Sequence, residues 1–327
     1  MKLIYSSNTN PYFNLAMEEH LLKNHNEDMF ILWRNIPSVI VGKNQNSYEE
    51  INIEYIKENN IPVVRRLSGG GCVFHDLGNI NFTFISCNNN FSDFKTFTQP
   101  IIDLLKSLDI NAEFSGRNDL LIDGQKFSGN AQYNYKNKVM HHGTLLFSSQ
   151  INDLSSALKV NPLKYQGRSV KSVKSRVTNI KNHLNQDLSV VEFKKLIMNY
   201  VYQTVDNATY YALSDEDIHS INTLVDTKYN TWDWNFGKSP TYSFKNDLKF
   251  TGGNIHLNLD VSKGIITNIK FYGDFFGKCD ISFIEELLVD CKHEESEIVH
   301  TLKDIDINDY LLGADLNILT NLLLGAK

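Results

Sequence analysis

The first candidate for chemistry is a run in which two arginines precede three consecutive glycines: Val64-Arg65-Arg66-Leu67-Ser68-Gly69-Gly70-Gly71-Cys72-Val73-Phe74-His75-Asp76. Glycines have no side chain to hold a ligand away, and they accept positive φ, so successive backbone N–H groups can point into one concavity. Such a concavity binds anions, and adjacent guanidinium groups strengthen the binding. The run therefore predicts a site for a nucleotide or a phosphate ester, with a glycine-rich hairpin turn as the alternative.

A second candidate is Lys126, which lies in an expected strand beside Phe127, Ser128 and Gly129. A lysine that faces inward from a strand is costly to bury unless an anionic group meets it. A lysine that points to solvent at a hairpin is the alternative. Because Gly129 and the glycine run accompany this lysine, we favour a site where a phosphate and a carboxylate approach each other closely.

The pair His141-His142 is a third unusual feature. Adjacent residues of a strand point to opposite faces, so at most one of the two faces a shared site, and we predict no metal site from them. That histidine either hydrogen-bonds a ligand or a loop, or it is a buried structural residue. The chain has neither a G-x-x-x-x-G-K-S/T motif nor a G-x-G-x-x-G motif that opens a helix, which excludes a standard P-loop or Rossmann site.

The composition is that of a globular protein with room for two domains. The 327 residues are 42% hydrophobic and 21% charged. A formal net charge of -6 argues against a dedicated nucleic-acid-binding protein. The four cysteines match no zinc spacing and are too few for a disulfide framework, so we expect reduced thiols in the cytoplasm. We expect neither a signal peptide nor a membrane span.

Regular elements must position these segments. Asn10-Pro11 supplies a cap and a first-turn proline for a helix that extends to about His25. Asp123-Gly124 predicts a hairpin of residues 118–122 and 126–132. Residues 72–74 and 81–85 alternate like two paired strands. Further strands are expected at residues 3–5, 29–33, 39–41, 63–65 and 143–147, and helices at residues 51–59, 94–108, 153–158, 190–205 and 215–227.

A second, small α+β domain is expected after about residue 246, where the pattern restarts. We predict domain 1–246 and domain 247–327, with the aromatic run of residues 232–237 packed at the end of the first. The basic, apolar-poor stretch of residues 159–182 predicts a long functional loop, with a solvated connection as the alternative. The second domain is expected to contain strands at residues 248–250, 255–261 and 265–271 and helices at residues 281–289, 295–302 and 307–323.

Together these segments resemble the lipoate–protein ligase A family. The resemblance covers about residues 10–237, with a weaker similarity in the C-terminal region, and its separated motifs occur in the family's order. The motifs are Asn10-Pro11-Tyr12-Phe13-Asn14-Leu15-Ala16, Leu32-Trp33-Arg34-Asn35, the run from Arg65 to Asn79, Ser115-Gly116-Arg117-Asn118-Asp119, Lys126 with Ser128-Gly129, His141-His142-Gly143-Thr144-Leu145-Leu146, Ser175-Arg176-Val177-Thr178-Asn179, and the run from Trp232 to Gly237.

The resemblance implies an α+β fold, with a biotin/lipoate ligase-type catalytic domain of mixed β-sheets and flanking helices and a small α+β accessory domain. It implies an enzyme that uses ATP and Mg²⁺ to convert lipoate to lipoyl-AMP and then transfers the lipoyl group to the ε-amine of a specific lysine. The acceptors would be apo lipoyl domains of 2-oxoacid dehydrogenase E2 subunits and the glycine cleavage H protein. The enzyme would be a cytoplasmic monomer with no nucleic-acid partner, no membrane partner and no metal site of its own.

The resemblance also implies roles for individual residues. Lys126 would be catalytic, contacting the lipoyl carbonyl and the α-phosphate, where a fixed cation offsets developing charge. Arg66 would bind phosphate or the carboxyl end of lipoate, and the loop of residues 159–181 would close over the adenylate. The residues expected to bind ATP or lipoyl-AMP are Arg66, Ser68, Gly70, Gly71, Cys72, Val73, Phe74, His75, Asn79, Asp119, Lys126 and His142.

Cys72 departs from the family, which often has a small residue such as alanine at this position. Cysteine behaves as a small hydrophobe, so a backbone contact there is retained, and a reactive thiol is the alternative. Related octanoyl- and lipoyl-transferases work through a cysteine thioester without ATP, which gives a second enzyme hypothesis. A non-catalytic lipoyl-domain-binding protein is disfavoured by the presence of Arg66 and Lys126, and biotin ligase is disfavoured by the glycine run.

Overall fold

The chain divides into two compact units. The computed structural model describes residues 1–87, 94–116, 118–150, 153, 156–158, 177–239 and 241–325. The first unit contains residues 1–43 and 61–230, and the second contains residues 44–60 and 231–327. The units meet in sequence at residues 230 and 231, ahead of the position after residue 246 that the sequence suggests. The assignment of separate functions to domains 1–246 and 247–327 stays a prediction.

An eight-stranded mixed sheet forms the centre of the first unit, in the order β11-β1-β2-β6-β10-β9-β8-β7. Strands β11, β1 and β2 run parallel, and β2, β6, β10, β9, β8 and β7 pair antiparallel. The strands are β1 (Lys2–Tyr5), β2 (Met29–Trp33), β6 (Asn79–Ser86), β7 (Ala112–Ser115), β8 (Asp119–Ile122), β9 (Gln125–Tyr135), β10 (Lys138–Leu146) and β11 (Thr209–Tyr210). This arrangement, together with its flanking helices, confirms the predicted α+β fold.

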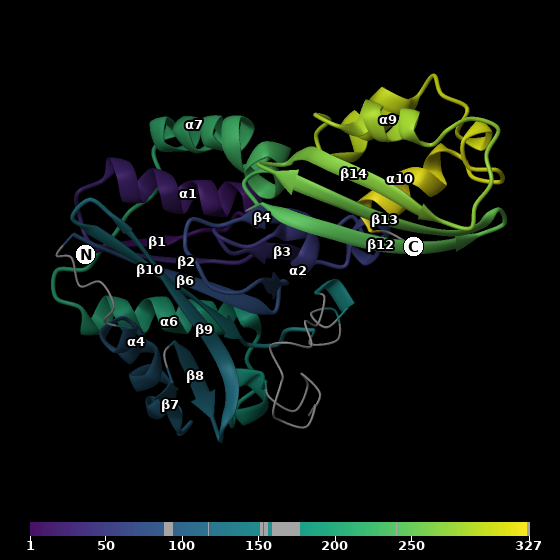
Figure 1. Ribbon diagram of the computed structural model, residues 1–327. Helices are drawn as coiled ribbons and strands as arrows, with labels where there is room; N and C mark the ends of the chain where they lie inside the picture. The colour runs from purple at the N-terminus through teal and green to yellow at the C-terminus, as the bar shows by residue number, and fades with distance from the viewer. Residues whose placement is uncertain are drawn as a thin grey trace. The chain divides into compact units, whose positions relative to one another are not determined.

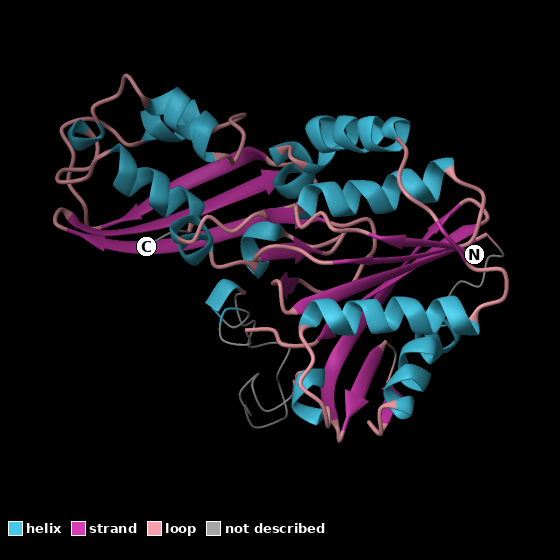
Figure 2. Cartoon of the chain, turned by 180° about the vertical axis from the view of Figure 1, so that it is seen from behind, coloured by secondary structure: helices cyan, strands magenta, loops and turns pink. Residues whose placement is uncertain are grey.

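Helices cover both faces of this sheet (Figures 1 and 2). Helices α4 and α6 lie on one face and pack on the main apolar core, while α1 and α7 lie side by side on the other. Every residue of β2 and β6 is buried, as expected for strands covered on both sides. The helices are α1 (Pro11–Asn24), α4 (Phe94–Ser107), α6 (Val190–Thr204) and α7 (Asp215–Leu224), with short helical turns η3 (Ile180–His183) and η4 (Val225–Tyr229).

Helix α1 begins as the sequence predicts. The Asn10 side chain accepts hydrogen bonds from the backbone N–H groups of Tyr12 and Phe13, and Pro11 occupies the first turn. The helix is buried around most of its circumference, and its two adjacent acids, Glu18 and Glu19, are both 1% exposed. A helix with buried acids must supply partners for them, and these partners form part of the site described below.

A separate small sheet carries the glycine run. Its order is β4-β3-β5, formed by β4 (Val63–Arg65), β3 (Ser38–Val41) and β5 (Val73–His75). The expected pairing of residues 72–74 with residues 81–85 is therefore wrong, because β5 pairs with β3 whereas β6 pairs with β2 and β10. Alternation within two neighbouring segments does not show which distant strand each one meets.

The second unit contains a three-stranded antiparallel sheet, β12-β13-β14, with helices beside it. Its first strand begins at Tyr242 rather than residue 248, and the helix expected at residues 307–323 is a short turn followed by a separate helix. The aromatic run of residues 232–237 belongs to this unit and not to the first, which corrects the expectation. The elements are α2 (Ser47–Glu50), α3 (Ile53–Glu58), η5 (Asp233–Gly237), β12 (Tyr242–Phe250), β13 (Gly253–Ser262), β14 (Ile265–Gly273), α8 (Ser282–Leu288), α9 (Glu295–Leu302), η6 (Ile307–Asp309) and α10 (Leu316–Leu324).

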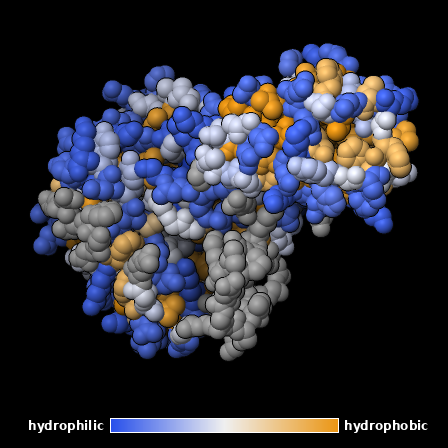
Figure 3. Space-filling model, viewed as in Figure 1, coloured by the Kyte–Doolittle hydropathy of each residue, from blue (hydrophilic) through white to orange (hydrophobic). Residues whose placement is uncertain are grey.

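Large apolar side chains remain exposed on the second unit, and apolar residues form orange patches on its surface in Figure 3. The exposed large apolar residues among those described in the second unit are Tyr272, Phe276, Phe283, Val289 and Leu312.

None of the helices that the structure describes is both long enough and apolar enough to cross a membrane. Residues 159–176 of the loop that the sequence predicts to close over the adenylate lie outside the described residues.

Candidate active site

One cavity of the first unit brings the glycine run and Lys126 together. Its volume is about 190 Å³. The small sheet contributes the glycine run to its wall, while β9 and β10 contribute Lys126 and His142. The residues that line it are Leu15, Trp33, Ile40, Arg66, Gly70, Gly71, Cys72, Val73, His75, Asn81, Asn118, Lys126, Gly129, Asn130, Ala131, His142, Gly143 and Thr144.

A β-bulge places Lys126 at this cavity. Asp123 (φ 51°) and Gly124 (φ 75°) form the predicted turn between β8 and β9. Leu120 then pairs with Ser128 but Leu121 pairs with Lys126, which leaves Phe127 as an extra residue. Residues three apart on a regular strand face opposite sides, and the bulge removes that alternation. Lys126 and Gly129 therefore both line the cavity.

The ammonium group of Lys126 is accessible, and among the described residues it forms an ion pair with Asp119. Its Nζ atom lies 2.8 Å from Oδ1 of Asp119, and the two side chains are 40% and 37% exposed. A Cβ atom at Gly129 would lie 3.0 Å from the same Nζ atom, so glycine leaves room for the lysine. The backbone of Lys126 is also held in place, because the Thr178 N–H group donates to the Lys126 carbonyl oxygen at 2.9 Å.

Arg66 organises the glycine run. Its Nη2 atom donates to the carbonyl oxygens of Gly69 (2.7 Å) and Gly71 (2.8 Å), and its Nη1 atom donates to that of Ile40 (3.2 Å). Gly70, between the two carbonyl groups, has φ 91°, and a Cβ atom there would lie 3.0 Å from Nη2. Of the three glycines, Gly70 is the one whose positive φ requires a residue without a side chain. Burial lowers the pKa of Arg66 to about 10, so it stays charged at neutral pH.

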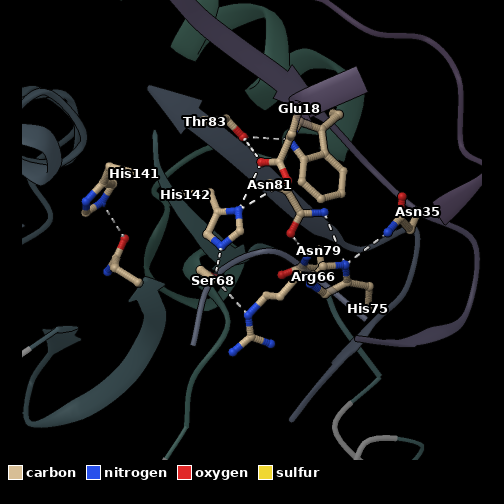
Figure 4. A network of polar contacts seen from close by, with 12 residues as sticks. Glu18, Asn35, Arg66, Ser68, His75, Asn79, Asn81, Thr83, His141 and His142 are labelled. Carbon is tan, nitrogen blue, oxygen red and sulfur yellow. Dashed lines mark hydrogen bonds and ion pairs between the residues drawn. The ribbon is translucent and has the colours of Figure 1, made fainter. Parts of the chain in front are cut away.

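A buried chain of hydrogen bonds connects Arg66 to Glu18 (Figure 4). Arg66 Nε donates to Ser68 Oγ at 3.1 Å, and Ser68 Oγ lies 2.6 Å from His142 Nε2. Because the Glu18 carboxylate at Nδ1 can only accept, the neutral ring of His142 carries its hydrogen on Nδ1, and the Ser68 hydroxyl donates to Nε2. That proton points to Glu18, whose Oε1 and Oε2 atoms lie 3.0 and 3.2 Å from Nδ1.

This series of hydrogen bonds ends at Glu18, and a second series of hydrogen bonds ends at the same carboxylate. Thr83 Oγ1 donates to Glu18 Oε1 at 2.5 Å, and Trp33 Nε1 donates to Thr83 Oγ1 at 2.9 Å. Every hydrogen of both chains thus points toward the carboxylate. A buried carboxylate with several donors is well satisfied, and it supplies the negative charge opposite the buried guanidinium.

A second network sets the tautomer of His75. The amide of Asn14 donates to Oδ1 of Asn35 at 2.9 Å, so the Nδ2 atom of Asn35 is the donor to Nδ1 of His75 at 3.1 Å. His75 therefore carries its hydrogen on Nε2, and this atom is buried without a hydrogen-bond partner among the residues described. His75 lines the cavity. Burial, together with nearby Arg66 and His142, lowers the pKa of His75 to about 3, so the ring is neutral near pH 7.

The structure brings most of the predicted site residues together. Eight line the cavity: Arg66, Gly70, Gly71, Cys72, Val73, His75, Lys126 and His142. Three further predicted residues do not line the cavity but contact residues that do: Ser68 contacts His142, Asn79 contacts Asn81, and Asp119 contacts Lys126. Phe74 is buried and pairs with Val39 of β3. As expected for adjacent strand residues, His142 lines the cavity while His141 stacks on Phe82 and Phe97 in the core.

Several site residues were not predicted. Glu18 is the most important of these, because an acid in a helix normally indicates a solvent-facing position. Six residues of the cavity wall occur inside the motifs that carry the family resemblance, so their position in a motif was the available signal: Leu15, Trp33, Asn118, Gly129, Gly143 and Thr144. Of these, Gly129 also supported the prediction of a site at Lys126. The remaining unpredicted residues of the wall are Ile40, Asn81, Asn130 and Ala131.

Comparisons with known proteins match both the N-terminal and the C-terminal part of the chain. Residues 10–202 match the lipoyl protein ligase A/B catalytic domain, and residues 239–323 match the bacterial lipoate protein ligase C-terminus. Lipoate–protein ligase 1 of Staphylococcus aureus is 45% identical over 320 residues, which cover 96% of this chain and 97% of the relative. The chain belongs to the lipoate–protein ligase family. The predicted family membership and the prediction that the protein is a ligase are confirmed.

Solved structures of lipoate ligases have the same fold. LipL1 of P. falciparum, in complex with lipoate, matches with a TM-score of 0.62 and 28% identity, and the match covers 99% of each chain. An archaeal bipartite ligase from Thermoplasma acidophilum, studied with its E2 lipoyl domain, has a TM-score of 0.64 and 27% identity over 72% of this chain and 96% of its own. A lipoate–protein ligase A bound with ATP has a TM-score of 0.62 and 25% identity, covering 72% of this chain and 98% of its own.

Proposed function

We propose that this ligase joins lipoate to a protein lysine in two steps that use ATP. The lipoate carboxylate attacks the α-phosphate of ATP, forming lipoyl-AMP and releasing pyrophosphate. The ε-amine of the acceptor lysine then attacks the mixed anhydride, forming an amide and releasing AMP. The observation that supports this most strongly is the position of Lys126, an accessible ammonium group in the same cavity as the glycine run.

In the first step Lys126 would act on the charge that develops during attack. An ammonium group in contact with the carboxylate and the α-phosphate reduces their repulsion and stabilises the negative charge of the transition state. His75 also lines the cavity, and its Nε2–H group is buried without a hydrogen-bond partner among the described residues. The predicted contact of Arg66 with phosphate or carboxylate stays a prediction, because four of its N–H groups already donate to protein acceptors.

Mg²⁺ would enter with the nucleotide. No aspartate or glutamate lines the described cavity, and two carboxylates that contact lining residues are already engaged, Asp119 with Lys126 and Glu18 with His142. The residues present therefore do not fit a magnesium site made by the protein. Mg²⁺ commonly keeps several waters and binds substrate phosphates, which is the mode that suits this cavity.

The acceptors we propose are apo lipoyl domains of 2-oxoacid dehydrogenase E2 subunits and the glycine cleavage H protein. The archaeal relative was studied together with an E2 lipoyl domain. The monomeric state and the cytoplasmic location stay predictions from the sequence.

The direct test incubates the purified chain with lipoate, Mg-ATP and an apo lipoyl domain and measures the mass of the acceptor. We expect the mass to increase by one lipoyl group, and AMP and pyrophosphate to appear in equal amounts. Two controls are needed: a reaction without ATP, and a reaction with an acceptor whose target lysine is replaced by methionine. Modification of the acceptor without ATP would contradict the proposed reaction.

A second candidate is an ATP-independent acyl transferase that works through a cysteine thioester. The observation that favours it is that Cys72 lines the cavity. We expect Cys72→Ser to retain activity within about threefold, because serine nearly conserves the side-chain volume and the ligase mechanism needs no thiol. Loss of all activity in Cys72→Ser, together with an acyl group trapped on the parent chain by mass spectrometry, would favour the transferase.

A further inference from the structure

A cluster of two imidazole groups and a carboxylate lies where α1 ends and α7 begins. His20 Nε2 and His25 Nε2 lie 2.8 and 2.9 Å from the same oxygen, Oδ1 of Asp217. The three donor atoms all lie within 4.8 Å of one another. Helices α1 and α7 are adjacent in both views of the first unit (Figures 1 and 2). None of the three residues lines the cavity of the active site.

The surrounding residues orient the three groups. Asp217 Oδ2 accepts from the Tyr211 hydroxyl at 2.6 Å and from the backbone N–H and the hydroxyl of Ser214 at 2.9 Å each, which turns Oδ1 toward the histidines. The other ring nitrogen of His20, Nδ1, lies 3.0 Å from the side-chain amide of Asn24. Because the Asp217 carboxylate can only accept, His20 Nε2 carries a hydrogen in this hydrogen-bonded arrangement, and that hydrogen would leave Nε2 when a metal ion binds there.

The backbone of this region is held as well. Lys138 donates to the carbonyl oxygens of Leu22 (3.1 Å) and His25, which fixes the last turn of α1. His20 and Asp217 are buried, whereas the His25 side chain is 20% exposed. Among the three residues, His25 therefore lies nearest to solvent.

We propose that His20, His25 and Asp217 bind one divalent transition-metal ion. Two imidazole nitrogens and one carboxylate oxygen form a donor set that suits Zn²⁺, and water would complete the coordination on the side of His25. Zinc–nitrogen and zinc–oxygen bonds of roughly 2.0–2.2 Å separate neighbouring ligand atoms by more than a hydrogen bond does, so the three groups open slightly around the ion. The ion would replace the two histidine–aspartate hydrogen bonds and clamp α1 to α7.

Helix α1 connects the proposed metal site to the active site. Glu18, which accepts from His142, precedes His20 by two residues on one helix. An ion that binds only the folded chain raises the free energy of unfolding, and the increase grows with the logarithm of the ion concentration above Kd. We therefore expect Zn²⁺ to raise the thermal midpoint of the chelator-treated chain, independently of ATP and lipoate.

The test titrates Zn²⁺ into the full-length chain, stripped with a chelator, in competition with a chromophoric chelator. We expect one ion per chain with micromolar or tighter affinity, and d–d absorption bands of a low-symmetry site when Co²⁺ is used. His25→Gln and Asp217→Asn should weaken binding at least tenfold. His219→Gln is the matched control, because His219 is an exposed histidine of the same α7 helix outside the cluster, and this variant should bind like the parent chain.

A measurement on the parent chain covers the case in which a variant does not fold. Diethyl pyrocarbonate should modify His25 without metal and spare it when Zn²⁺ is present, while His219 reacts equally in both samples. The proposal is overturned if the parent chain binds no Zn²⁺ at tens of micromolar, if folded His25→Gln binds as tightly as the parent, or if Zn²⁺ does not protect His25. The three groups would then be a hydrogen-bonded connection between two helices.

Discussion

The two cations that line the cavity are held in different ways. Arg66 is buried and donates four hydrogen bonds to Ser68, Gly69, Gly71 and Ile40. Lys126 is 40% exposed and pairs with one exposed acid, Asp119. An exposed ion pair contributes little to stability, so an anionic ligand can replace it at small cost. Arg66 would have to give up several buried hydrogen bonds to do the same. From this comparison we expect Arg66 to shape the site and Lys126 to contact the substrate.

The largest effect is expected for Lys126→Ala. Removal of a fixed charge that stabilises a transition state typically lowers the rate by about 10²–10³-fold. We expect that loss in lipoate-dependent pyrophosphate exchange, with the thermal midpoint unchanged within error, because the side chain is well exposed. Lys136→Ala, which removes an exposed lysine between β9 and β10 outside the cavity lining, is the matched control and should retain most of the activity. Near-normal exchange by the alanine variant would remove Lys126 from the mechanism.

Arg66→Lys separates architecture from ligand binding. One ammonium group keeps the charge but cannot reproduce the planar fork that holds two glycine carbonyl groups and Ser68. We expect the free energy of unfolding to fall by roughly 1–3 kcal/mol, as for buried acceptors left unpaired. The KM for ATP should rise as the glycine run loosens. Denaturant unfolding and exchange kinetics measure the two effects. An unchanged stability with abolished exchange would show that Arg66 is a ligand-binding cation like Lys126, and the comparison would fail.

Glu18→Gln tests whether the buried chain behind Arg66 matters for catalysis. The substitution removes the charge opposite Arg66 and puts an amide N–H2 group beside donors that point at the carboxylate, namely Nδ1 of His142 and Oγ1 of Thr83. We expect about a tenfold loss in pyrophosphate exchange, equivalent to one misplaced hydrogen bond.

Glu19→Gln is the matched control for this variant. Glu19 is an equally buried acid on the same helix, but its partners are Lys23, Lys228 and Tyr229. We expect it to lower stability while kcat and KM for ATP stay close to those of the parent chain. Equal kinetic losses in both variants would mean that α1 acts only through its stability.

Local sequence patterns predicted much of what positions Lys126. The cap at Asn10 and the turn at Asp123-Gly124 act within a few residues, so the start of α1 and the β8–β9 hairpin could be predicted. The shared cavity of Lys126 and the glycine run was predicted because both segments need an anion. The role of each predicted residue in binding stays a prediction.

Features that depend on distant partners could not be predicted. The bulge at Phe127 depends on how β8 and β9 meet, and nothing in the residues around it marks an extra position. The burial of Glu18 depends on His142 and Thr83, which follow it by 124 and 65 residues. Residues 44–60 fold with the second unit through contacts such as Tyr48 with His293, and no local signal indicates that pairing.

The smallest effect concerns pH, and it belongs to the side of the cavity that holds Arg66. Burial lowers the pKa of His75 to about 3, against about 6.5 for an exposed histidine. Between these values the unfolded chain binds a proton that the folded chain does not, so stability is complete above pH 6.5 and falls as the pH decreases toward 3. The slope for one group approaches about 1.4 kcal/mol per pH unit at low pH, but from pH 7.5 to pH 6 the loss is only about 0.8 kcal/mol. Denaturant unfolding at pH 7.5, 6 and 5 should show a weaker pH dependence for His75→Gln than for the parent chain. An unchanged dependence would mean that His75 is readily protonated in the folded state, and its assigned Nε2–H tautomer would no longer follow from burial.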